Sequence, residues 1–135
     1  TEIYTIVTTH FLWTDYYGHR EGEPDHRIHE LGEMLKITNS LPPHILCGDF
    51  NIPRHRSPLY DILANTYTDT IPETYTSSLD KTLHRLGDNP ATQELFTDFM
   101  VDYLFTKPPY TVNNVTLTFG VSDHAAVSAT IGNAF

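Results

Sequence analysis

Two short polar motifs, far apart in the chain, carry residue types suited to metal and phosphate chemistry. The first is Gly48-Asp49-Phe50-Asn51, and the second is Ser122-Asp123-His124. Each follows an apolar run and places a carboxylate beside another polar side chain. The ends of strands in an open α/β sheet are common positions for such residues. Together the two motifs predict a functional site built from distant parts of the chain.

The first motif can direct two polar groups at one point. In an extended segment, residues two apart project to the same face, so Asp49 and Asn51 can act together. The carboxylate can hold a divalent cation or take a proton from water, and the neutral amide can orient the attacking group. Mg²⁺ prefers oxygen ligands and often uses only one or two carboxylates. The alternative is that both residues simply form a turn after a strand.

The second motif precedes an alternating run, residues 125–131, which predicts a final strand. His124 could donate a proton or stabilise an anionic phosphate, or could be an ordinary hydrogen-bonded residue. Asp102 is its expected partner, because a carboxylate within the apolar run Val101–Phe105 is costly to bury alone. Such a partner would fix the imidazole tautomer and raise its basicity.

A third candidate, His10, ends the β-branched run Ile3–Thr9. That composition predicts a central strand. A histidine at the end of this strand could be a second acid facing a phosphate, or it could serve packing alone.

The elements that must position these residues alternate between strands and helices. Asp25 is a candidate N-cap of a first helix, and Ser57-Pro58 has the pattern that opens a second one. We therefore predict an α/β fold, a mixed β-sheet with helices on one side. The side chains expected to face the core are Ile28, Leu31, Met34 and Leu35 in the first helix, and Leu59, Ile62 and Leu63 in the second.

In this order, Thr9-His10, Gly48–Asn51, Asp102-Tyr103 and Ser122–His124 resemble the motifs of the endonuclease/exonuclease/phosphatase superfamily, the deoxyribonuclease I-like proteins. The resemblance spans nearly the whole chain. It implies one half of a four-layer α/β sandwich and metal-dependent hydrolysis of a phosphoester by direct attack of water, with Mg²⁺ or Mn²⁺ as cofactor.

The resemblance also implies a role for each matching residue. Asp49 would position or deprotonate the water, and Asn51 would orient it. His124, paired with Asp102, would contact the scissile phosphate, and His10 would be a second histidine there. The implied catalytic residues are His10, Asp49, Asn51, Asp102 and His124, and the implied metal ligands are Asp49, Asn51 and Asp123.

The chain departs from the family pattern at its beginning. Family members are longer, and their N-terminal half supplies an Asn and a metal-binding Glu, which Glu2 does not match. We expect residues 1–135 to form a single domain that corresponds to the C-terminal half of the catalytic domain. The competing hypothesis is a catalytically incomplete fragment that acts as a structural or interaction module. Its partner would be the missing N-terminal half, or a second copy bound through an exposed sheet face.

Charge and loop composition bear on the substrate. A net charge of −9 argues against broad electrostatic binding of nucleic acid. Cations nevertheless follow the first motif, and a polar segment, residues 66–89, could form a loop over the site. The substrate stays open among nucleic acid, a phospholipid head group and a small phosphodiester. Candidate substrate-binding residues are Arg54, Arg56, His84 and Arg85, and Trp13, Tyr16 and Tyr17 could stack on a ring or simply pack.

Other features narrow the alternatives. The single cysteine, Cys47, excludes an internal disulfide, and no stretch is long and apolar enough to predict a membrane span. No targeting segment is recognisable, so the compartment stays open. Eight histidines, with His19, His26 and His29 close together, raise the alternative of structural zinc, but their spacing fits no tight zinc motif.

Overall fold

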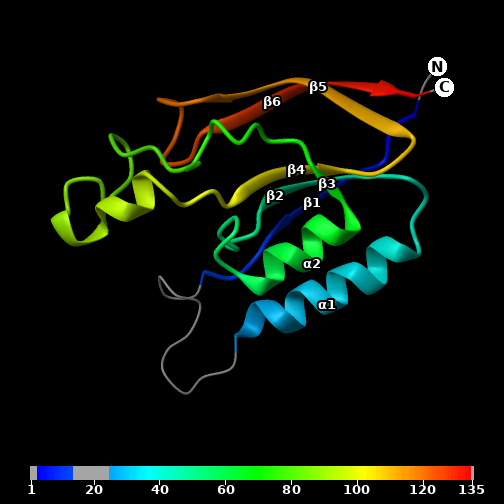
Figure 1. Cartoon of the computed structure of the whole chain (residues 1–135), viewed down its shortest axis with the longest axis horizontal. Coiled ribbons are helices and arrows are strands. Elements are labelled where there is room, and N and C mark those ends of the chain that lie inside the picture. The colour runs from blue at the N-terminus through cyan, green and yellow to red at the C-terminus, as the bar shows by residue number, and fades with distance from the viewer. Residues whose placement is uncertain (1–2, 14–24, 135) are drawn as a thin grey trace.

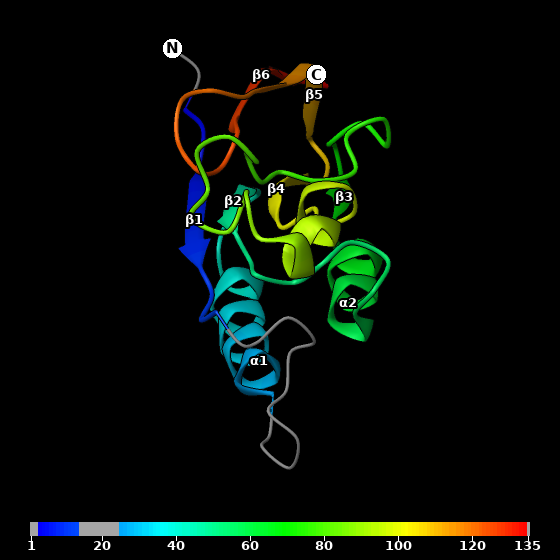
Figure 2. The same ribbon diagram turned by 90° about the vertical axis from the view of Figure 1, so that its left-hand side faces the viewer.

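A computed structural model describes residues 3–13 and 25–134, and these residues form three layers. A four-stranded sheet lies in the middle. A two-stranded hairpin covers one of its faces, and two α-helices cover the other (Figures 1 and 2). The α/β fold with helices on one side of a mixed sheet is therefore confirmed.

The four-stranded sheet has the order β1-β2-β4-β3. Its strands are β1 (Ile6–His10), β2 (Ile45–Asp49), β4 (Asp102–Thr106) and the short β3 (Thr68–Asp69). β1 and β2 are parallel, whereas β4 runs antiparallel to both β2 and β3. The prediction that residues 3–9 form a central strand of the sheet is therefore wrong. β1 is the edge strand of the described sheet, and its side chains alternate between exposed and half-buried.

Both helices begin at the predicted caps. Helix α1 (His26–Asn39) starts after Asp25, whose side chain accepts a hydrogen bond from the Arg27 backbone N–H. Helix α2 (Pro58–Thr66) starts after Ser57, which accepts from the Leu59 N–H, and proline occupies the first turn.

The buried faces of the helices are narrower than the sequence pattern indicates. Leu31, Leu59 and Leu63 are buried against the sheet, as expected. Ile28 is 60% exposed and Ile62 is 44% exposed, so the prediction that these two face the core is wrong. A helix on one face of a small sheet buries only the stripe that points at the strands.

Strands β5 (Tyr110–Thr118) and β6 (Ala126–Asn133) form an antiparallel hairpin rather than joining the larger sheet. The hairpin packs through Leu117 and the adjoining Ala125 onto the same core as the central strands. Between β3 and β4 the chain makes a long excursion that includes a 3₁₀ helix, η1 (Pro90–Phe96). None of the helices among residues 3–13 and 25–134 has the length and apolar character needed to cross a membrane.

Candidate active site

Strand register brings three candidate residues to one end of the sheet. His10 is paired with Asp49 across the parallel β1–β2 ladder, and Asp49 is paired with Asp102 across the antiparallel β2–β4 ladder. Residues directly opposite one another in adjacent strands present their side chains on the same face. The end of β1, the end of β2 and the start of β4 therefore form one polar edge.

The close approach of β1 and β2 at this edge depends on Gly48. Its φ is +135°, and a Cβ placed there would lie 1.9 Å from the carbonyl oxygen of Thr9. Any other residue would collide with the neighbouring backbone and would also occupy a strained conformation. The glycine of the first motif thus has a structural reason, which is to let Asp49 lie beside the end of β1.

His124 reaches the polar edge from the segment that precedes β6. That segment is held by the excursion between β3 and β4: the Ala125 N–H donates to the Ser78 carbonyl at 2.8 Å, and the Asp80 N–H donates to the Asp123 carbonyl at 2.8 Å. The buried Ser78 hydroxyl also accepts from the Asp102 N–H at 3.2 Å. The sequence predicted only that the polar residues 66–89 could form a loop over the site, and no local signal marked Ser78 or Asp80 as the residues that hold His124.

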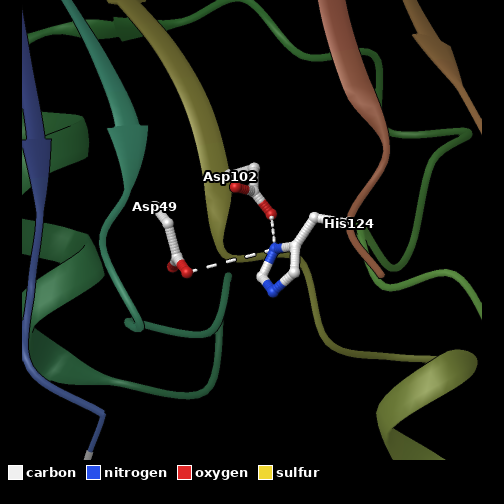
Figure 3. Close-up of side chains that lie close together, drawn as sticks. All are labelled: Asp49, Asp102 and His124. Carbon is white, nitrogen blue, oxygen red and sulfur yellow. Dashed lines mark hydrogen bonds and ion pairs between the residues drawn. The ribbon is translucent and has the colours of Figure 1, made fainter. Parts of the chain in front are cut away.

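His124 and Asp102, the expected histidine–carboxylate pair, are in contact (Figure 3). His124 Nδ1 lies 2.7 Å from Asp102 Oδ2 and 4.0 Å from Asp49 Oδ2. The hydrogen bond to Asp102 raises the pKa of His124 above its ordinary value, and partial burial opposes that rise. With Nδ1 directed at Asp102, the imidazole can offer its Nε2 to a substrate.

Asp49 is half-buried and electrostatically unfavourable as an anion. Burial raises the pKa of Asp49, and the nearby charge of Asp102 adds to the rise. A hydrogen bond from the Asn51 N–H at 2.8 Å partly compensates. A carboxylate held in this way is suited to accept a proton or to bind a cation, since either would relieve the repulsion.

Asn51 is buried beneath the polar edge in a left-handed conformation, with φ of 50°. Its side-chain Nδ2 donates to the Phe11 carbonyl at 2.7 Å. Because this nitrogen is committed, the amide oxygen is the side-chain atom that can act as a ligand or as an acceptor from water.

His10 differs from the other candidates in being open to solvent: its side chain is 74% exposed, and Nε2 lies 3.5 Å from Asp49 Oδ2.

A divalent cation fits this donor set. Among the described residues, the carboxylates of Asp49 and Asp102 and the ring of His124 offer ligand atoms within 4.8 Å of one another. Hard carboxylate oxygens suit Mg²⁺ or Mn²⁺. Asp123, also expected as a ligand, is exposed and lies outside this group. His26 and His29 lie outside it too, and His19 is outside the described residues.

The arginines after the first motif do not face this site. The buried Arg54 guanidinium bonds to Asp69 and to the Ile71 carbonyl, so its expected contact with substrate is not supported by its position. Arg56 pairs with Glu94 and Asp98. Both arginines have carboxylate partners elsewhere in the fold.

His84 and Arg85 lie closer to the candidate catalytic groups. They line a small cavity of about 80 Å³ whose walls also include Trp13, Asn51 and His124. Trp13 packs edge-on against Phe99, with ring centroids 6.0 Å apart, and burial lowers the pKa of His84. Tyr16 and Tyr17, the other aromatic candidates, are outside the described residues.

Comparison with known proteins places the fold. No family model matches the sequence, and no curated protein matches it. The structure is similar to an endonuclease/exonuclease/phosphatase from Beutenbergia cavernae, with a TM-score of 0.57 and 17% identity over 95% of this chain and 36% of that chain. Two Bacteroides thetaiotaomicron proteins, an endonuclease/exonuclease/phosphatase family protein and a mannosyl-6-phosphatase, each give a TM-score of 0.49 at 16% identity. They cover 79% and 80% of this chain and 44% and 45% of their own.

The chain therefore has the endonuclease/exonuclease/phosphatase fold, as the order of its motifs predicted. It spans 36% of the length of the Beutenbergia protein. At 17% identity the likeness concerns the fold alone.

Proposed function

We propose that this chain carries the catalytic groups of a metal-dependent phosphoric ester hydrolase, a phosphodiesterase or a nuclease-type enzyme. The observation that carries the proposal is the contact of Asp49, Asp102 and His124 at one end of the sheet, where distant segments converge (Figure 3). The substrate would be a phosphoester from nucleic acid, a phospholipid head group or a small phosphodiester.

In this proposal the chain's own residues divide the work. Asp49, whose carboxylate is held by the Asn51 N–H, orients the attacking water and accepts its proton. His124, held by Asp102 at 2.7 Å, contacts the phosphate through Nε2 and stabilises its developing charge. The exposed His10 is a second phosphate contact at the same edge.

The metal ligands proposed are Asp49 and Asn51, with Asp123 as a further candidate. Bound Mg²⁺ or Mn²⁺ would neutralise charge on the phosphate. The neighbouring charge of Asp102, which helps to raise the pKa of Asp49, makes a cation favourable beside that carboxylate.

The direct test is hydrolysis of bis-p-nitrophenyl phosphate by the full chain with Mg²⁺ or Mn²⁺. We expect turnover that chelation abolishes and that Asp49→Asn lowers by at least about 10²-fold. The matched control is Asp61→Asn, since Asp61 is an exposed carboxylate of α2. Equal rates in wild type and Asp49→Asn would contradict the assignment.

A second candidate function is that of a catalytically incomplete module. Two observations favour it: the chain spans only 36% of the Beutenbergia protein, and the outer edge of β1 has no strand partner among the described residues. Unpaired strand edges are sites of association, so a missing N-terminal half or a second copy would pair there. A folded chain without turnover, whose activity appears only after such a piece is added, would support this alternative.

A further inference from the structure

A charged side chain outside the proposed catalytic set contacts Asn51, one of the residues of that set. Arg27, in the first turn of α1, has a side chain that is only 5% exposed. Its Nε and Nη2 both donate to the Asp25 carboxylate at 2.9 Å, and its Nη1 donates to the backbone carbonyl of Asn51. The guanidinium therefore joins the start of a helix to the loop that follows β2.

Asn51 is the residue through which this contact reaches the site. Asn51 makes three hydrogen bonds. Its backbone N–H donates to Asp49 Oδ1, its side-chain Nδ2 donates to the Phe11 carbonyl, and its backbone carbonyl accepts from Arg27. Its φ of 50° lies in the left-handed region, which asparagine adopts more readily than most residues other than glycine, and the three hydrogen bonds favour this conformation. The contacts thus run without a break from Asp25 to the carboxylate of Asp49.

We propose that Arg27, oriented by Asp25, is a positioning residue that fixes Asp49 and Asn51 for reaction. The proposal rests on the proposed hydrolytic function. Without the guanidinium, the Asn51 carbonyl loses its buried partner and the left-handed residue can relax. The backbone N–H of Asn51, which holds the Asp49 carboxylate, then moves with Asn51. Small displacements of this kind are sufficient to impair catalysis, because an error of about 1 Å can lower a rate by about 10²-fold.

The chain supplies a matched control for a purely structural role. Arg54 has a side chain with the same 5% exposure, pairs with Asp69 at 2.9 Å and donates to the Ile71 carbonyl at 3.0 Å. Its partners belong to the segment around β3. Arg27→Met and Arg54→Met each remove a buried guanidinium together with its ion pair to a carboxylate, so both variants should be destabilised.

Steady-state kinetics on bis-p-nitrophenyl phosphate with Mg²⁺ separate the two roles. For Arg27→Met we expect kcat to fall by about 10- to 100-fold with KM changed by less than about threefold. Arg54→Met, measured below its own unfolding transition, should keep kcat within about threefold of wild type. Arg27→Lys should recover only part of the loss, because an ammonium cannot reproduce the fork that holds Asp25 and Asn51 together.

Nuclear magnetic resonance gives a second readout that does not depend on turnover. The backbone and side-chain amide signals of Asn51 should shift and exchange faster with solvent in Arg27→Met, and should be unchanged in Arg54→Met. If wild type shows no hydrolysis, the proposed function fails while this measurement still decides the positioning role. If Arg27→Met does not fold, Arg27→Lys provides the same comparison. Unchanged Asn51 signals, or equal losses of kcat in both methionine variants, would overturn the proposal.

Discussion

Replacing Asp102 with asparagine tests the histidine–carboxylate pair on which the site depends. The substitution keeps the shape of the side chain and removes its charge, so His124 loses the group that raises its pKa. A hydrogen bond between charged partners contributes about 1.5–3 kcal/mol. The side chains are 27% and 16% exposed, which favours the lower end of that range.

The pH dependence of this effect has a definite sign. A raised histidine pKa means that the pair stabilises the native state fully below the ordinary histidine pKa, and that this contribution is lost as pH rises through the raised value. We expect Asp102→Asn to be about 1.5 kcal/mol less stable than wild type near pH 5.5. Near pH 9, well above the ordinary histidine range, the difference in stability should vanish or reverse. His124 is then uncharged, and the variant no longer has the repulsion between the carboxylates of Asp102 and Asp49.

Urea unfolding at the two pH values and a histidine titration by nuclear magnetic resonance measure these quantities. In the variant, the titration of His124 should move to lower pH. Asp61→Asn, which changes an exposed carboxylate of α2, is the control and should change the free energy of unfolding by no more than about 0.5 kcal/mol. A variant that is equally destabilised at both pH values, or one in which His124 titrates at unchanged or higher pH, would refute the pairing.

Two further predictions concern the framework and the edge of the site. Gly48→Ala forces a Cβ against the Thr9 carbonyl, so we expect a loss of more than about 4 kcal/mol in the free energy of unfolding. The control is Gly32→Ala in α1, where a Cβ meets nothing within 4 Å, and it should be neutral or stabilising. Similar urea midpoints for the two variants would disprove this. His10→Ala removes a 74% exposed side chain, so the free energy of unfolding should stay within about 0.5 kcal/mol of the wild-type value. The same variant should hydrolyse bis-p-nitrophenyl phosphate about 10²-fold more slowly. Undiminished turnover would remove His10 from the proposed site.

The features that the sequence predicted are those encoded by local patterns. Asp25 and Ser57 were recognisable as helix caps because their side chains act on backbone groups two residues away. The order of the polar motifs predicted the fold, and the apolar neighbours of Asp102 indicated that it needs a partner, which is His124. Each of these inferences depends on one segment or on the order of segments.

The features that the sequence did not predict arise from tertiary contacts. Arg54 follows the first motif directly, yet it is buried because Asp69 and the Ile71 carbonyl, from the segment around β3, provide its partners. Ser78 lies in a polar segment without periodicity and acquires its place only when that segment meets β4. In the same way, no local signal in Ile3–Thr9 shows whether a second strand will pair with its outer edge.

In the proposed site, Asp49 and Asn51 bind a divalent cation next to the phosphate contact of His124, which Asp102 orients. Titration of the isotopically labelled chain with Mn²⁺, followed by nuclear magnetic resonance, tests it most directly, because the ion broadens signals of nearby nuclei. We predict that the first signals to broaden are those of Asp49, Asn51 and His124, and that Asp49→Asn weakens this effect. Broadening that begins instead around Glu94 and Asp98, or that is the same in Asp49→Asn, would contradict the account.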